Sequence, residues 1–469
     1  MSDLVRQTAT AVVAALRQGD VTPLDCLAAL ERRIAEVNPR LNALVTLCFD
    51  RARSRARDLM KKPVAERGTL CGLPVPIKDL VDVAGVRSTQ GSRIFADRIA
   101  EDSDILVKHL EGEGGLIYAM SNTPEFGAGA QTFNDVFGIT RNPWNVAMTP
   151  SGSSGGAGAA LASGMAWLAH GSDLGGSLRN PASFCGIVGL RPTPGRVACT
   201  PGTTIDGTLG VEGPMARNVT DLALMLDAMS GAEPGDPLSL PKENKSFRSH
   251  LESVSKPKRI AVSRDLGITP VDPEVADLVL AAARKLEVAG VVVEEVHPNL
   301  ASAMNCFQVL RAASYAAGML PLLEKHRDLL KPEVIWNIEK GLRLSGEDIG
   351  RAQAQRAGLF HAMDSFLQRY DALLCPTTIV PPFPVEERYV KRCAGVEFES
   401  YIDWLLIVAV ATLSMCPAIS IPCGFTASGL PVGLQIIGRN RGDARLLQIA
   451  KFTEDALGLG AITPIDPGG

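Results

Sequence analysis

The sequence predicts an α/β protein, because segments with helical and strand patterns alternate along most of its length. The chain has 469 residues, of which 46% are hydrophobic, enough for one large domain or two to three smaller ones with a sizeable core. Its most apolar stretch, residues 404–438, has no charged residue but is interrupted by prolines and glycines. A membrane-spanning helix needs about 20 consecutive apolar residues, so we expect this stretch to form buried helix and strands instead.

Two helices are predicted near the N-terminus. Thr22 is a good N-cap for a helix that has proline at its first position and aspartate in its first turn, and we expect this helix to end at Asn38-Pro39. A second helix covers about residues 51–62, with the sequence RARSRARDLMKK. Alternating Arg and Ala is typical of a solvated helix face, so we assign this helix no role in RNA binding.

The C-terminal half alternates more regularly between helix and strand. We expect helices at residues 272–290 and 402–415, and strands at residues 259–266, 291–296, 371–376, 418–421 and 431–437. The polar residues 231–259 include prolines and lysines and are the best candidate for a surface connection.

Charge and cysteine content argue against several classes of function. Lys and Arg number 47 against 51 Asp and Glu, a formal net charge of -4, so we expect a small-molecule partner rather than nucleic acid or an anionic membrane. Ten cysteines without a CxxC pair predict reduced thiols, no disulfide and no metal site. The N-terminus has no basic segment followed by an apolar run, which predicts no secretory signal and a cytoplasmic protein.

Residues with catalytic chemistry concentrate between residues 72 and 196. Lys78 follows the apolar run LPVPI, Ser153 and Ser154 lie in TPSGSSGGAGAALASG, and Ser177 follows two glycines in AHGSDLGGSLRNP. Taken singly, such a lysine is typical of a strand end, and such Gly and Ser clusters are typical of loops. Together they supply what amide hydrolysis needs: a nucleophile, a base and donors for an oxyanion.

Lys78 is the best candidate for the base. The histidines are dispersed, and only His170 lies in the glycine-rich band, where we expect a structural role. Burial lowers a lysine pKa by up to about 3–5 pH units, which populates the neutral amine. Gly175 and Gly176 let the backbone before Ser177 turn its N–H groups toward one point, which predicts a main-chain oxyanion hole.

At these residues the sequence strongly resembles the amidase signature family, serine hydrolases that use a Ser, cis-Ser, Lys triad. The spacing of Lys78, Ser153 and Ser177 matches that family. The resemblance covers most of the chain apart from about residues 231–366, and its segments are GLPVPIKD, GITRNPWN, SGSSGGAGAALASG, GSDLGGSLRNPASFCGIVGLRPTPGRV, GPMARNVTDLALML and PAISIPCGFTASGLPVGLQIIG.

The resemblance implies a role for each of these residues. Ser177 would be the nucleophile, Ser153 the bridging serine with a cis peptide bond to Gly152, and Lys78 the base. The implied oxyanion hole consists of the N–H groups of Leu174, Gly175, Gly176 and Ser177. Three further residues would support the triad. Ser154 would donate to the neighbouring backbone or hydroxyls, and Asp173 and Arg179 would hold the loop rather than react. The chain departs from the family in having Ser151-Gly152 for Gly-Gly and Ser172 for Thr, and neither departure touches the triad.

The resemblance also implies the architecture: an amidase signature fold with a large mixed β-sheet surrounded by α-helices. Residues 1–63 would form an N-terminal helical region, residues 64–469 the catalytic domain, and about residues 300–400 a variable region that shapes the substrate pocket. It implies a small-molecule amide substrate, no cofactor and no metal. Family members often form homodimers through their N-terminal helices, and the sequence leaves the oligomeric state open.

The substrate pocket is less well defined by the sequence. Residues 120–137 are expected near it, and the tentative contacts there are Phe126, Gln131 and Phe133. Helical spacing favours the core for a further set of residues, which are Met304, Phe307, Tyr315, Met319 and Trp336. If they line the pocket instead, an aryl or other apolar acyl group fits. The sequence does not rank aryl or alkyl amides, indole-acetamide-like amides, carbamates and esters.

Three other functions can be compared with an amidase. Residues 152–156, GSSGG, match the nucleophile elbow of an α/β-hydrolase with Ser154 as nucleophile, but the preceding residues make a poor strand. A phosphate-binding module lacks the expected glycine motifs. The strongest alternative is a glutaminase-type subunit of a tRNA-dependent amidotransferase, which shares the triad and supplies ammonia to partner subunits.

Overall fold

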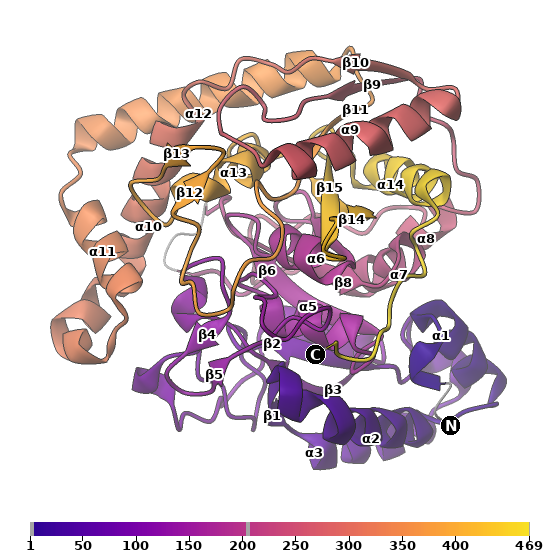
Figure 1. The fold of residues 1–469 in the computed structure, drawn as a ribbon. Helices are drawn as coiled ribbons and strands as arrows, with labels where there is room; N and C mark the ends of the chain where they lie inside the picture. The colour runs from indigo at the N-terminus through magenta and orange to yellow at the C-terminus, as the bar shows by residue number, and fades with distance from the viewer. Residues whose placement is uncertain (1–3, 203–206, 469) are drawn as a thin grey trace.

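The computed structural model describes residues 4–202 and 207–468, which fold around a large and a small β-sheet (Figure 1). The large sheet has the strand order β10-β9-β11-β15-β14-β7-β8-β6. Its strands are β6 (Leu168–Asp173), β7 (Val188–Arg191), β8 (Val211–Ala216), β9 (Arg259–Val262), β10 (Val292–Glu295), β11 (Ala372–Pro376), β14 (Ala418–Phe425) and β15 (Pro431–Ile437). Strands β9, β10 and β11 run parallel and the other pairs antiparallel, so the predicted mixed sheet is confirmed.

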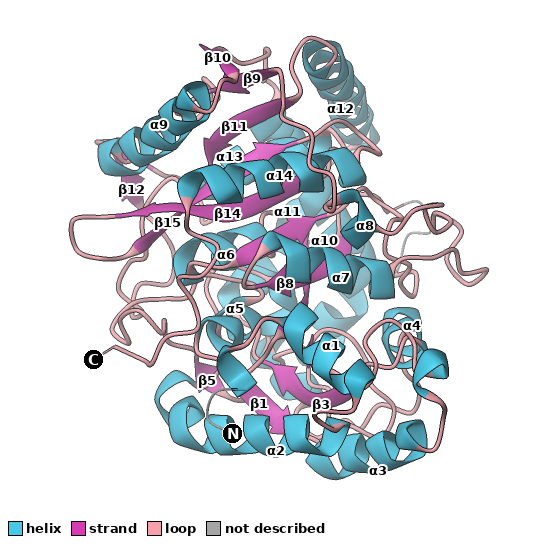
Figure 2. Ribbon diagram, turned by 90° about the vertical axis from the view of Figure 1, so that its right-hand side faces the viewer, coloured by secondary structure: helices cyan, strands magenta, loops and turns pink. Residues whose placement is uncertain are grey.

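The small sheet joins the N-terminal segment to the remainder of the chain. Its order is β1-β3-β2, with β1 (Leu44–Leu47), β2 (Pro74–Lys78) and β3 (Leu116–Ser121). Around it lie α1 (Ala9–Gln18), α2 (Pro23–Leu41), α3 (Phe49–Met60) and α4 (Ile105–Gly112), in the lower part of Figure 2. Because β1 pairs with β3, the small sheet extends across the boundary that the sequence places after residue 63.

Helices cover both faces of the large sheet. They are α5 (Gly155–Ala162), α6 (Arg179–Cys185), α7 (Val219–Met229), α8 (Phe247–His250), α9 (Pro273–Val288), α13 (Leu406–Leu413) and α14 (Asp443–Leu457). The buried helix α5 packs against both sheets, contacting β1, β2 and β3 on one side and β6 and β8 on the other. This position requires small residues, since a Cβ on Gly156 would lie 2.4 Å from the backbone nitrogen of Asn122.

Residues 303–367 form a helical layer beside the sheets. It consists of α10 (Ala303–His326), α11 (Pro332–Leu342) and α12 (Gly346–Leu367), on the left of Figure 1. Two short hairpins complete the fold, β4 (Phe133–Asn134) with β5 (Gly138–Ile139) and β12 (Arg392–Cys393) with β13 (Val396–Glu397). The segment predicted as a connection, residues 231–259, leads from α7 to β9 and contains α8.

Most predicted elements occur, with shifted ends. Thr22 caps α2 in a capping box as expected, but the helix continues past Pro39 to Leu41. A proline in the last turn removes only one terminal hydrogen bond, and Asn42 in the left-handed conformation ends the helix instead. The predicted second helix begins two residues earlier, at Phe49.

The apolar stretch at residues 404–438 forms α13, β14 and β15 inside the core, as predicted. Among the described residues, one helical stretch, Ala303–Leu329, is long and apolar enough to span a membrane by length and composition. In its most apolar window 44% of the residues are buried within the protein, and α10 packs against α11, α12 and α13. Core helices of soluble proteins meet the same criterion of length and composition.

Candidate active site

Lys78 lies at the end of β2, fully buried, and its Nζ contacts three hydroxyl groups. The Nζ atom is 2.6 Å from Ser153 Oγ, 2.9 Å from Ser154 Oγ and 3.0 Å from Ser172 Oγ. Burial lowers the pKa of Lys78 to about 7, against the opposing effect of the negative charges of Glu212 and Asp173. Near neutral pH a large fraction of this amine is therefore uncharged.

The three hydroxyls match the hydrogen-bonding capacity of a neutral amine, which has two N–H donors and one lone pair. The Ser154 hydroxyl donates its proton to the Ser172 carbonyl at 3.4 Å and accepts the N–H of Ser172 at 3.3 Å. Because its one proton is used in this way, Ser154 acts as an acceptor toward Lys78. Ser172 can accept the second N–H. The lone pair then remains for the hydroxyl proton of Ser153, the nearest of the three.

The loop that presents Ser153 is held by close backbone contacts. The peptide bond between Gly152 and Ser153 is cis, as the sequence predicted. A Cβ on Gly152 would lie 2.8 Å from the backbone nitrogen of Gln131, so only glycine fits here. Ser151 has a φ of 63° and donates its hydroxyl to the Ala130 carbonyl at 3.0 Å. The departure from Gly-Gly at this point thus adds an anchor for the loop.

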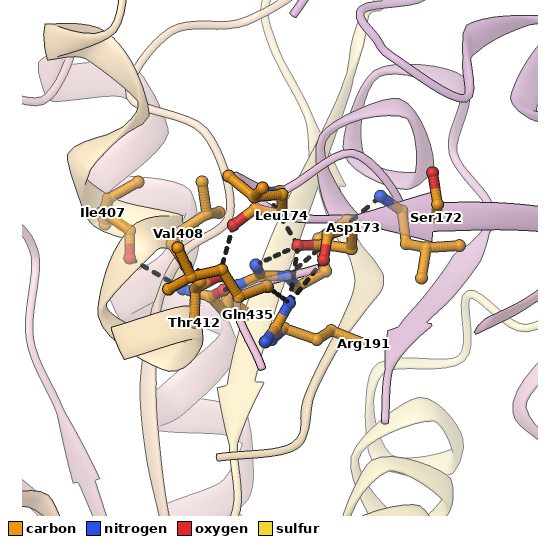
Figure 3. A network of polar contacts seen from close by, with 12 residues as sticks. Ser172, Asp173, Leu174, Arg191, Ile407, Val408, Thr412 and Gln435 are labelled. Carbon is orange, nitrogen blue, oxygen red and sulfur yellow. Dashed lines mark hydrogen bonds and ion pairs between the residues drawn. The ribbon is translucent and has the colours of Figure 1, made fainter. Parts of the chain in front are cut away.

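Asp173, at the end of β6, is a buried carboxylate held by two arginines (Figure 3). Arg179 donates to it through Nη2 at 2.8 Å and Nε at 3.0 Å, and Arg191 Nη1 lies 3.6 Å away. The backbone N–H groups of Gly176 and Leu178 donate to the same carboxylate at 2.9 and 3.2 Å. Burial alone would raise the pKa of Asp173, but these partners hold it well below its usual range. Asp173 and Arg179 therefore fix the loop, as the sequence suggested.

Two anchored carbonyls orient the backbone that precedes Ser177. The Asp173 carbonyl accepts from Arg191 Nη1 at 2.5 Å, and the Leu174 carbonyl accepts from Thr412 Oγ1 at 2.6 Å (Figure 3). In a trans peptide the N–H points opposite to the carbonyl, so the N–H groups of Leu174 and Gly175 point away from these anchors. Both residues line the same cavity as Ser177.

One predicted member of the oxyanion hole differs from expectation. The Gly176 N–H is committed to Asp173, so it stabilises the loop instead of facing the cavity. The N–H groups of Leu174, Gly175 and Ser177 have no hydrogen-bond acceptor among the described residues. These three amides are thus the ones free to bind an oxyanion.

Ser153 and Ser177 open onto one cavity of about 130 Å³. Its apolar wall consists of Leu80, Phe126, Phe307, Tyr315, Ile402 and Leu405. Phe126 thus lies where it was predicted. Phe307 and Tyr315, for which the core was favoured, line the cavity from one face of α10.

Two other predicted pocket residues lie elsewhere. The Gln131 side chain is buried, and its Nε2 donates to the Val385 carbonyl at 2.5 Å, so it holds a neighbouring loop. Phe133 faces a different hollow, where the cationic groups of Lys331 and Arg388 lie 5.2 and 4.8 Å from its ring centre. Position in the chain placed both residues near the site but did not indicate which way their side chains turn.

A hydrogen-bonded pair behind Lys78 gives His170 the structural role expected of it, with Glu212 as a partner that was not predicted. His170 Nδ1 accepts the backbone N–H of Lys78 at 3.2 Å, so its proton lies on Nε2, which is 2.7 Å from Glu212 Oε2. His170 thereby links β2 to β6. Because side chains two residues apart share a face of a strand, His170 and Ser172 both approach Lys78. The two-residue spacing of His170 and Ser172 was the signal in the sequence that could have placed both beside Lys78.

Within residues 4–202 and 207–468, no group of three or more His, Cys, Asp or Glu side chains is placed to hold a metal ion. The ten cysteines are free thiols, and eight of them are buried. The chemistry that this site can perform rests on hydroxyls, a neutral amine and backbone amides.

Comparison with known proteins agrees with this geometry. The protein-family model for Amidase matches residues 25–447. The chain is 36% identical to an acylamidase of Rhodococcus erythropolis over 451 residues, 94% of each chain. It is 32% identical to a glutamyl-tRNA(Gln) amidotransferase subunit of Halothermothrix orenii, over 95% of this chain and 96% of that protein. It also resembles the crystal structure of a bacterial aryl acylamidase of the amidase signature family, with a TM-score of 0.90, 28% identity and coverage of 98% and 99%.

Proposed function

Because this chain belongs to the amidase signature family and is a hydrolase of amide C–N bonds, we propose that Lys78, Ser153 and Ser177 carry out its reaction. The observation that carries this proposal is the buried Lys78 amine, with its pKa of about 7, only 2.6 Å from the hydroxyl of Ser153. A base with a pKa near the working pH combines a populated basic form with an adequate driving force. Ser153 lines the same cavity as Ser177, the nucleophile of the proposal.

The proposed reaction has two stages. Ser177 Oγ attacks the amide carbonyl and gives its proton to Ser153 Oγ, while Ser153 gives its own hydroxyl proton to neutral Lys78. The amides of Leu174, Gly175 and Ser177 stabilise the oxyanion. The protonated lysine then returns a proton, through Ser153, to the departing amine or ammonia. Water hydrolyses the acyl-enzyme on Ser177 by the same proton path in reverse. No step requires the Asp173 carboxylate to change protonation.

The substrate is proposed to be a small amide with an aryl or other apolar part. The cavity wall, with Phe126, Phe307 and Tyr315, supports this choice. The likeness to an acylamidase and to an aryl acylamidase supports it as well. We also propose a cytoplasmic location, because free thiols such as these ten cysteines are typical of a reducing compartment.

Glutamine, the substrate of the alternative function, is less suited to this cavity. Glutamine carries an ammonium group beside its carboxylate, and a buried ammonium needs an acidic partner. The described residues that line the cavity include neither Asp nor Glu. We therefore favour a free amidase over the ammonia-supplying component of an amidotransferase.

The decisive experiment measures product release from aliphatic, aryl and arylalkyl carboxamides, anilides and glutamine. The purified chain is compared with Ser177→Ala and Lys78→Ala, and with Ser163→Ala as a matched control. The Ser163 hydroxyl is buried and donates to main-chain carbonyls of the helix that precedes it. We expect hydrolysis of an amide that both site variants abolish and the control retains. Added hydroxylamine would trap the acyl-enzyme as a hydroxamate. Activity that persists in Ser177→Ala, or that requires glutamine and a partner protein, would contradict the proposal.

A further inference from the structure

Arg311 is a buried cation in the wall of the active-site cavity. It lies on α10 between Phe307 and Tyr315, four residues from each, so the three side chains share one face of the helix. All three line the cavity that contains Ser153 and Ser177. The arginine is only 3% exposed. A charged group in such a position is costly unless it is paired.

The contacts of Arg311 hold its guanidinium in place without neutralising it. Nη1 donates to Asn337 Oδ1, and Nη2 donates to Gln308 Oε1 at 3.1 Å. The rings of Tyr315, Trp336 and Tyr401 surround the guanidinium carbon, with their centres 5.6 to 5.9 Å away. Nε has no hydrogen-bond partner among the described residues. Side-chain amides and aromatic rings orient the cation, but they carry no formal negative charge.

The charged groups nearby leave Arg311 without an ion-pair partner. Lys340 donates to the same Gln308 oxygen at 3.1 Å, so two cations share one neutral acceptor. Asp403 accepts from the amide of Gln308 at 3.2 Å, and the charges of Asp403 and Glu399 act on Lys340. Within the described residues, none of these carboxylates forms an ion pair with Arg311. By contrast, Arg179 and Arg191 share the buried carboxylate of Asp173.

We propose that Arg311 binds a carboxylate carried by the substrate, so that the preferred substrates are apolar amides with one free carboxylate. This inference rests on the proposed amidase function and defines its substrate class. The carboxylate can belong to the acyl part, as in a monoamide of a dicarboxylic acid, or to the amine part, as in an N-acyl amino acid. In either case it completes the ion pair that the protein leaves open. The apolar wall contacts the remainder of the substrate.

The test compares matched pairs of amides that differ only in this charge. One series contains monoamides of dicarboxylic acids of increasing length against neutral alkanamides, and a second contains N-acyl ω-amino acids against N-acyl alkylamines. We expect at least one carboxylated amide to have a kcat/KM about 10-fold or more above its neutral partner, mainly through KM. The series that shows this preference identifies the part of the substrate that carries the carboxylate.

Variants then assign the preference to Arg311. Arg311→Met is expected to lower kcat/KM for the carboxylated amide by about 10- to 100-fold, as for a lost charge-assisted hydrogen bond, and to change the neutral amide less than about 3-fold. Arg311→Lys should restore part of the loss. Arg264→Met, at an exposed ion pair with Glu295, is the control and should change neither substrate.

A measurement on the unchanged protein guards against misfolding of the variants. Dicarboxylates of the preferred length should inhibit hydrolysis of a neutral amide competitively, about 10-fold more strongly than the matching monocarboxylates. Equal kcat/KM for charged and neutral amides, together with equal inhibition, would overturn the proposal for Arg311 while leaving the amidase function intact. Absence of hydrolysis for every amide would instead refute the proposed function itself.

Discussion

Two ionisable groups beside Ser177 are equally buried, but one can lose its charge and the other keeps it. Lys78 and Asp173 are both fully buried. Lys78 contacts three hydroxyls and forms no ion pair within the described residues, and its pKa falls to about 7. Asp173 contacts two arginines and two backbone amides, and its pKa lies well below the usual range. The contacts, rather than the burial, decide which group can exchange a proton and which remains a fixed charge.

The largest effect is expected from removing the fixed charge. Asp173→Asn leaves the buried guanidinium groups of Arg179 and Arg191 without a counter-charge, and breaking a buried pair in this way costs about 3–5 kcal/mol. Urea denaturation measures the free energy of unfolding. The control is Glu295→Gln, which breaks the exposed pair with Arg264 and should cost less than about 1 kcal/mol. Equal losses in the two variants would remove the contrast between Asp173 and Lys78.

Lys78→Met tests the other half of the comparison, the buried amine, through the pH dependence of the free energy of unfolding. The folded pKa of Lys78, about 7, lies below its ordinary value of 10.5, so between these pH values the unfolded chain binds a proton that the folded chain does not. The contribution of Lys78 to the free energy of unfolding therefore rises with pH across this window, by about 1.4 kcal/mol per pH unit.

This slope is measured as a difference between variants. The wild-type free energy of unfolding minus that of Lys78→Met, from urea denaturation at pH 7, 8 and 9, should increase with pH. Lys285→Met, on the exposed side of α9, should give a constant difference. A constant difference for Lys78→Met as well would mean that Lys78 remains charged in the folded protein.

A smaller effect is expected from Glu212, whose charge raises the pKa of Lys78. Since neutral Lys78 is the proposed base, kcat/KM should rise with pH through about 7. Glu212→Gln keeps an acceptor for His170 Nε2 but removes the charge, so the midpoint should move to lower pH. The shift should stay below about one pH unit, because Glu212 is partly exposed and solvent screens it. Glu295→Gln, on the surface, should leave the midpoint unchanged, and an upward shift in Glu212→Gln would contradict the assignment of Lys78 as base.

The sequence predicted the parts of the site that depend on local motifs. The lysine after an apolar strand, the serine pair and the glycines before Ser177 are each encoded within a few residues, and their roles follow from the family resemblance. The contacts that hold this loop were only partly predictable, because they come from distant segments. Arg191 donates to the Asp173 carbonyl, and Thr412 donates to the Leu174 carbonyl. The commitment of the Gly176 N–H to Asp173 likewise depends on how the loop folds back.

The substrate pocket was harder to predict for a geometric reason. Phe307, Arg311 and Tyr315 recur every four residues, and this period is the same whether the helix face meets the core or a cavity. The one signal in the sequence that distinguished a cavity from the core was Arg311, a charged residue among apolar ones on this helix face. Gln131 is not a contact, although its neighbour Ala130 lines the cavity, because its side chain turns away and donates to the Val385 carbonyl.

The smallest effect concerns Ser172, which stands where the family often has threonine. Its hydroxyl lies 3.0 Å from Lys78 Nζ and can accept the second N–H of the neutral amine. Ser172→Ala removes this acceptor, and a single hydrogen bond of about 0.5–1.5 kcal/mol corresponds to a 2- to 13-fold lower kcat/KM. Ser172→Thr, which retains the hydroxyl, should restore most of the activity. If alanine and threonine behave alike, the third hydroxyl does not help to hold the amine, and Ser153 and Ser154 alone distinguish the contacts of Lys78 from those of Asp173.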